Sequence, residues 1–165
     1  MFLETFDLML EARKASLYSN CKRRKIGVTL PGPHDENIWG YNNTIKGCPT
    51  CDRDKCPATH AEVMAIQQAI YCKADREITK LFIWAEVSCH QCLNYIRRYS
   101  AIALIFCLSP ESYFTEYPVI ARRSEEISAR REFAKSLGLS IVELDREEIV
   151  QYELSKYPQT NTEPN

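Results

Sequence analysis

The chain has 165 residues, 45% of them hydrophobic and 26% charged, and its 21 basic and 22 acidic residues leave a net charge of −1. This composition is typical of a globular protein that can bury its own core. Because a surface that holds a long nucleic acid usually carries a basic surplus, the balance argues against a nucleic-acid partner and favours a small-molecule substrate.

The predicted elements begin with a helix over the first twenty residues, where Phe2, Phe6, Met9 and Leu10 share one side. In chain order there follow strands at 26–30 and 36–41, an irregular loop at 42–59, a helix at 60–72, a strand at 81–85, a helix at 89–99, a strand at 101–108, a helix at 119–137, a strand at 139–144 and a helix at 147–156. The polar residues 157–165 are expected to be disordered. This order predicts an α/β protein with a mixed sheet and helices on both faces, in one domain over residues 1–156.

The start of the chain and its cysteines indicate a compartment. Glu4, Asp7 and Glu11 lie where a secretory leader would be apolar, and the longest apolar run, residues 101–108, is too short to span a bilayer. We therefore expect a cytoplasmic protein with no membrane partner. In that reducing compartment the eight cysteines are expected to be metal ligands or core residues, not disulfides.

Two short motifs carry the predicted chemistry: His60-Ala61-Glu62 and Cys89-His90-Gln91-Cys92, each at the start of a predicted helix. Free backbone N–H groups at a helix start stabilise thiolates, so Cys89 and Cys92 can share a metal with His60. One histidine and two thiolates leave the fourth tetrahedral position of a zinc ion open for water, as catalytic zinc sites require. Glu62 can then move the proton of that water without being a ligand.

Each motif alone has simpler interpretations. A His-x-Glu occurs often by chance, and a Cys-x-x-Cys can be a redox pair, half of a structural zinc site or two core cysteines. Together, however, the two motifs lie at the starts of two successive predicted helices with one strand between them, and this arrangement favours a catalytic zinc site over the simpler interpretations.

The two motifs together resemble the signature of the zinc-dependent cytidine/deoxycytidylate deaminase superfamily, and the resemblance spans about Met1 to Leu144. It implies a cytidine-deaminase-like three-layer α/β/α fold with a five-stranded mixed sheet. It also implies hydrolytic attack at C4 of cytosine, with Glu62 protonating N3 and then the departing ammonia. Ser88 departs from the family, which usually has proline before the first cysteine. We expect Ser88 to act as the N-cap instead.

Further short matches favour the deoxycytidylate (dCMP) branch of bacterial or phage type. Residues 21–27 resemble its entry to the first strand, and Gly40-Tyr41-Asn42 resembles the end of its second. The resemblance implies substrate contacts from Asn42, Ala61 and Tyr113, and conversion of dCMP to dUMP for thymidylate synthesis. A turn residue at Asn42 and a loop aromatic at Tyr113 are the simpler interpretations. The basic residues 23–25 either help to bind the substrate phosphate or form a solvated cluster, and we favour the cluster for most of them.

A second zinc is predicted from Cys48-x-x-Cys51-x4-Cys56 in the loop, with Cys21 completing a four-cysteine structural site, as dCMP deaminases of this type often have. Free thiols, or a site that uses three of them, are the alternatives. Cys72 and Cys107 are predicted to be core residues, and neither His34 nor His90 is a predicted ligand.

Several alternatives stay open. The substrate could be cytidine, cytosine or an adenosine in tRNA, or the chain could be a non-catalytic zinc-binding module, against which Glu62 argues. The resemblance implies a homo-oligomer, a hexamer, that responds to nucleotide effectors together with Mg²⁺. The charges of the helix at 119–137 form either a solvated face with i,i+4 pairs, which we favour, or an oligomer or effector surface; they are Arg122, Arg123, Glu125, Glu126, Arg130, Arg131 and Glu132.

Overall fold

A computed structural model of the chain describes residues 2–22, 24–33, 36–44, 58–114 and 117–156. The elements are α1 (Phe2–Ser16), β1 (Gly27–Pro31), β2 (Asn37–Tyr41), α2 (Ala61–Tyr71), β3 (Lys80–Ile83), α3 (His90–Tyr99), β4 (Leu104–Leu108), α4 (Pro110–Tyr113), α5 (Tyr117–Ser136), β5 (Ser140–Leu144) and α6 (Arg146–Lys156). No helix in the described ranges is long and apolar enough to cross a membrane.

The five strands form one mixed sheet in the order β2-β1-β3-β4-β5. β1 is antiparallel to both of its neighbours, so that Val28 faces Gly40 on β2 and Ile83 on β3. β3, β4 and β5 are parallel, and the connections between them run through α3 and α5. The mixed five-stranded sheet expected from the sequence is thereby confirmed.

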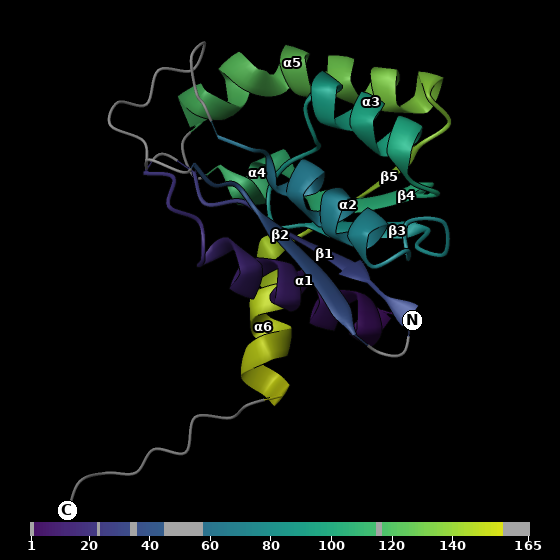
Figure 1. Cartoon of the computed structure of the whole chain (residues 1–165). Helices are drawn as coiled ribbons and strands as arrows, with labels where there is room; N and C mark the ends of the chain where they lie inside the picture. The colour runs from purple at the N-terminus through teal and green to yellow at the C-terminus, as the bar shows by residue number, and fades with distance from the viewer. Residues whose placement is uncertain (1, 23, 34–35, 45–57, 115–116, 157–165) are drawn as a thin grey trace, which may run out of the picture.

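The alternation of side chains along the central strands divides the core between the two faces of the sheet. Leu81 and Ile83 of β3 pack into a cluster with residues of α2, α3 and α5. Phe82 and Trp84 point to the other face and pack with residues of α1 and α6. Figure 1 shows these two helical layers on opposite sides of the sheet, which confirms the three-layer α/β/α expectation.

Two glycines allow helices to lie close to the sheet. A Cβ atom at Gly27 would clash with the backbone of α1, and one at Gly40 would clash with the carbonyl of Ala61 and the backbone of Ala65. Gly40 therefore fixes how closely the first turn of α2, which carries Glu62, lies on β2.

The structure corrects several predicted boundaries. α1 ends at Ser16 because Leu17 and Tyr18 form a turn, and β4 begins at Leu104, not at residue 101. α4 was not predicted, and Tyr113 is its last residue. Cys107 is buried as predicted, whereas Cys72 is exposed because it caps α2 at its solvent-facing end. Most of the predicted loop, residues 45–57, and the predicted tail lie outside the described residues.

Candidate functional site

The site forms where two helices start beside the carboxyl end of β3. His60 is the N-cap of α2 and Cys89 is the N-cap of α3, both with extended backbone (φ −72° and −68°). Cys92 lies one turn into α3. Because β3 and β4 are parallel, their carboxyl ends lie at the same edge of the sheet, where α/β proteins usually bind ligands.

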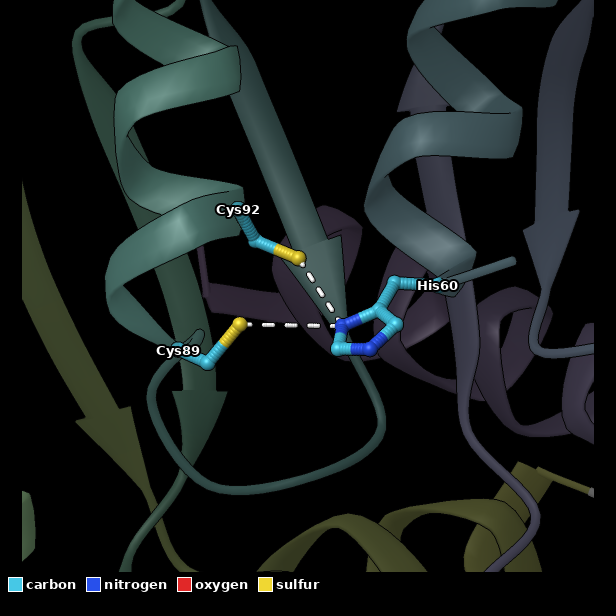
Figure 2. A group of neighbouring side chains, drawn as sticks. All are labelled: His60, Cys89 and Cys92. Atoms are coloured by element: carbon cyan, nitrogen blue, oxygen red, sulfur yellow. Dashed lines mark hydrogen bonds between the residues drawn. The ribbon is translucent and has the colours of Figure 1, made fainter. Parts of the chain in front are cut away.

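His60, Cys89 and Cys92 converge on one point. The Nδ1 atom of His60 lies 3.2 Å from Sγ of Cys92 and 3.6 Å from Sγ of Cys89, and the three ligand atoms lie within 4.8 Å of one another. Figure 2 shows the two cysteine side chains of α3 pointing toward the histidine ring at the start of α2. A set of one imidazole and two thiols fits zinc, and it leaves the fourth tetrahedral position open.

The two thiols differ in their electrostatics. A hydrogen bond from Cys92 lowers the pKa of the Cys89 thiol to about 3, against the opposing effect of burial. The same bond with Cys89, together with burial and the nearby Glu62 carboxylate, raises the pKa of Cys92 well above its usual range. The pair therefore gives up its first proton readily at Cys89, the more exposed of the two candidate ligands, as binding of a metal by thiolate requires.

Glu62 is the second residue of α2 and only 4% exposed. Its carboxylate raises the pKa of the Cys92 thiol, as expected of a charged group close to that sulfur. It therefore lies beside the three candidate ligands, although it does not belong to the converging group.

A cavity of about 420 Å³ opens beside this group, within the range of small-molecule sites. Its lining includes His60, Glu62 and Cys89, and also the predicted substrate contacts Asn42 and Ala61. Tyr113, the third predicted contact, is not among the described residues that line it; its hydroxyl accepts a bond from Nε of Arg24 at 3.4 Å.

The Asn42 side chain is largely occupied within the protein. Its Oδ1 accepts hydrogen bonds from the Ile26 amide and the Ser19 hydroxyl, both at 2.7 Å, and its Nδ2 donates to the Arg24 carbonyl at 2.7 Å. Asn42 therefore ties the end of β2 to the segment before β1.

Ser88 does not act as expected. The N-cap of α3 is Cys89, and the buried Ser88 hydroxyl has no hydrogen-bond partner in the described part of the chain. The prediction of a Ser88 cap is wrong because the helix starts one residue later than the predicted start.

Of the four cysteines predicted to bind a structural zinc, only Cys21 lies in the described residues. It is buried, it lines the cavity, and its Sγ accepts the backbone N–H of Arg24 at 3.5 Å. Cys48, Cys51 and Cys56 lie outside the described ranges.

The most charged part of the cavity was not predicted from the sequence. Glu86, three residues before Cys89, is 2% exposed and forms ion pairs with Arg24, Arg123 and Arg130. All four residues line the cavity. The available signal for Glu86 was a single carboxylate among the mostly apolar residues that follow β3.

The expectation of a solvated helix at α5 is correspondingly wrong for two of its residues. Arg130 does form an i,i+4 pair with Glu126. Arg123 and Arg130, however, are only 8% and 9% exposed, because their seven-residue spacing turns both toward Glu86. Arg24 is also half-buried by Glu86 and not part of a solvated cluster.

The sheet and the His/Cys/Cys group together define an α/β protein with a candidate zinc centre at two helix starts. Residues 4–108 match the protein family described as the cytidine and deoxycytidylate deaminase zinc-binding region. The chain belongs to this family of zinc-binding deaminases.

Solved structures share the fold. The dCMP deaminase of the cyanophage S-TIM5 in its apo form is similar with a TM-score of 0.59 at 20% identity, covering 85% of this chain and 96% of that one. The structure of that enzyme in complex with dCMP and dUMP has a TM-score of 0.57 at 22% identity, covering 82% of this chain and 93% of that one. A diaminohydroxyphosphoribosylaminopyrimidine deaminase/reductase of Thermotoga maritima gives 0.56 at 16% identity, covering 92% of this chain and 40% of that chain. Among curated proteins, no sequence matches this chain.

Proposed function

We propose that this chain catalyses the hydrolytic deamination of dCMP to dUMP with release of ammonia. The observation that carries the proposal is the convergence of His60, Cys89 and Cys92 on one point, with Glu62 beside them on the wall of the cavity. In the proposed reaction the C4–N bond of cytosine breaks, a C4–O bond forms with the oxygen of water, and ammonia leaves.

The three ligand residues and Glu62 have different roles in this proposal. When bound by His60, Cys89 and Cys92, zinc would act as a Lewis acid that lowers the pKa of water to about 7. Glu62 accepts one proton from the attacking water and delivers it to N3; it then takes the proton of the new C4 hydroxyl and delivers it to the amino group, which leaves as ammonia. Its burial beside the ligands keeps the carboxylate in reach of both the water and the ring.

The choice of a nucleotide is supported by the arginines of the cavity and by the similarity to a phage dCMP deaminase that was solved with dCMP and dUMP. Asn42 and Ala61 line the cavity and remain proposed substrate contacts, Asn42 through the second proton of its side-chain amide. Tyr113 would act indirectly, by holding Arg24.

Further elements of the proposal follow from the family resemblance. They are a structural zinc held by Cys21, Cys48, Cys51 and Cys56, a homo-oligomer, and regulation by a nucleotide effector with Mg²⁺. The position of Cys21, buried at the cavity, would place that structural zinc next to the segment that leads to Arg24.

The test is ammonia release by the purified zinc-loaded protein from dCMP, deoxycytidine, cytosine and an RNA anticodon stem-loop. We expect kcat/KM for dCMP to exceed that for deoxycytidine by at least about a hundredfold, because the 5′-phosphate makes charge-assisted contacts. Equal values for the two would assign the chain to nucleosides. Release from none of the four, with zinc bound, would leave a non-catalytic zinc module.

A further inference from the structure

One wall of the cavity gathers three arginines from distant parts of the chain. Arg24 precedes β1, whereas Arg123 and Arg130 lie on α5, and all three line the same cavity as His60 and Glu62. Arg123 donates to a Glu86 oxygen at 3.2 Å, Arg130 lies 3.7 Å from the same oxygen, and Arg24 donates to the other. Glu86 is therefore the common anion of the cluster.

The cluster has more positive charge than its carboxylates neutralise. Three guanidinium groups face two carboxylates, Glu86 and Glu126, so one positive charge remains. Hydrogen-bond donors are also in surplus, because each guanidinium has five N–H groups and each carboxylate accepts about four bonds. The Nε atoms of Arg123 and Arg130 are buried and have no partner within the described residues. Buried cationic donors without an acceptor are costly, and the uncompensated positive charge that they leave at this wall favours an anion beside it.

The guanidinium groups are held in place before any ligand arrives. Arg24 lies over the rings of Tyr113 and Phe114, 5.2 and 5.7 Å from their centroids, and Arg123 lies 5.5 Å from the Phe114 centroid. Arg130 also donates to the Val87 carbonyl at 3.2 Å, which ties it to the segment just before Cys89. Such pre-organisation lowers the entropy cost of binding an anion.

We propose that Arg123 and Arg130, together with Arg24, form a subsite for the phosphate monoester of the substrate, and that Glu86 orients their guanidinium groups. Guanidinium groups bind phosphate oxygens in pairs of parallel hydrogen bonds, which is why arginine clusters recognise phosphate. The subsite shares its cavity with the metal group, so one nucleoside monophosphate can place its base at Glu62 and its phosphate at α5. This inference rests on the proposed function and extends it to named residues of α5.

The competing explanation is a purely structural clamp that joins α5 to the segment between β3 and α3. A clamp and a phosphate subsite both predict that arginine variants lose stability. They differ in the ratio of the affinity for a nucleoside monophosphate to the affinity for its nucleoside. Loss of a clamp would weaken both affinities alike, whereas loss of a phosphate subsite would weaken only the first.

The experiment is calorimetric titration of the zinc-loaded full chain with dUMP and with deoxyuridine, neither of which is deaminated. In the wild type, dUMP should bind at least about a hundredfold more tightly than deoxyuridine. Arg123→Gln and Arg130→Gln should each reduce that ratio at least about tenfold. Arg131→Gln is the matched control on the same helix, because Arg131 pairs with Glu143 and does not line the cavity; its ratio should equal that of the wild type.

Inorganic phosphate separates the contribution of the phosphate group in the wild-type protein, which keeps the test valid if a variant fails to fold. Phosphate should weaken the binding of dUMP and leave the binding of deoxyuridine unchanged. A dUMP preference that survives in both arginine variants, or one that phosphate does not affect, would overturn the subsite. If the arginine variants keep the wild-type ratio of dUMP affinity to deoxyuridine affinity while the wild type deaminates dCMP, the subsite is refuted and the proposed function is not. If the ratio of dUMP affinity to deoxyuridine affinity falls in the arginine variants but the wild type does not deaminate dCMP, the proposed function is refuted and the phosphate subsite is supported.

Discussion

Glu86→Gln tests how much of the fold depends on the buried charge cluster. The substitution keeps the shape of the side chain and removes one negative charge, so the three arginines face Glu126 alone. The side chains of Glu86, Arg123 and Arg130 are only 2%, 10% and 11% exposed, so water screens their charges poorly. Breaking a buried ion pair by neutralising one partner costs about 3–5 kcal/mol. We take about 3 kcal/mol, because the amide oxygen of glutamine still accepts one hydrogen bond.

The matched control is Glu143→Gln, which removes the partner of Arg131 at 2.7 Å. These two side chains are 26% and 40% exposed, and surface pairs contribute at most about 1 kcal/mol. For a chain of this length, 1 kcal/mol corresponds to a shift in Tm of about 2–4 °C. Glu86→Gln should therefore lower Tm by about 6–12 °C, and Glu143→Gln by less than about 4 °C.

The assay is circular dichroism of the zinc-loaded wild type and both variants at one protein concentration, with urea unfolding for the free energy and thermal unfolding for Tm. The zinc content of each preparation is measured, since a loss of metal would add its own destabilisation. Equal free energies of unfolding for Glu86→Gln and Glu143→Gln would refute the reasoning, because they would show that the cluster is solvated in solution.

Three further predictions follow from the packing, the loop and the substrate. Gly40→Ala should displace the first turn of α2 from β2 and so lower both the zinc content and Tm. The control Ala69→Gly, at the far end of α2, should lower Tm alone, and equal zinc content in the two variants would contradict the prediction. Cys51→Ser should reduce zinc from two ions per chain to one, with Cys72→Ser as the unaffected control, and a wild-type content of one zinc would count against the second site. Salt should raise KM for dCMP more steeply than KM for deoxycytidine, because screening acts on the phosphate contacts, and parallel salt curves would argue against a charged subsite.

The metal group could be predicted from the sequence because its signals are local. His60 and Glu62 are two residues apart, Cys89 and Cys92 are three apart, and each pair begins a helix, so the motif itself places the side chains. The strands followed in the same way from local apolar runs, and β1 and β2, which correspond to neighbouring predicted strands, pair with each other in the sheet.

The charge cluster could not be predicted, because its members come together only in the folded chain. Arg24 is 62 residues from Glu86, and Arg123 is 37 residues from it. Periodicity places charges on one face of a helix, yet it does not say what that face covers; α5 therefore suggested a solvated surface. Recognition of Glu86 as the partner requires the topology that lays α5 beside the segment before Cys89.

Short elements and caps were missed for a different reason. α4 has only four residues, and its start depends on the Ser109 side chain, which accepts the Ser112 amide, and on Pro110 in the first turn. The predicted start of α3 lies one residue too early, because serine is the commoner cap whereas here the cysteine that follows it adopts the extended backbone.

The central claim is that Glu62 moves protons beside a zinc held by His60, Cys89 and Cys92. Zinc content and ammonia release from dCMP, measured on the same preparations of wild type and Glu62→Ala, test it most directly. We expect equal zinc per chain and a fall in kcat of at least about a hundredfold, the usual contribution of general acid–base catalysis. Turnover by Glu62→Ala near the wild-type rate, with zinc bound, would contradict it.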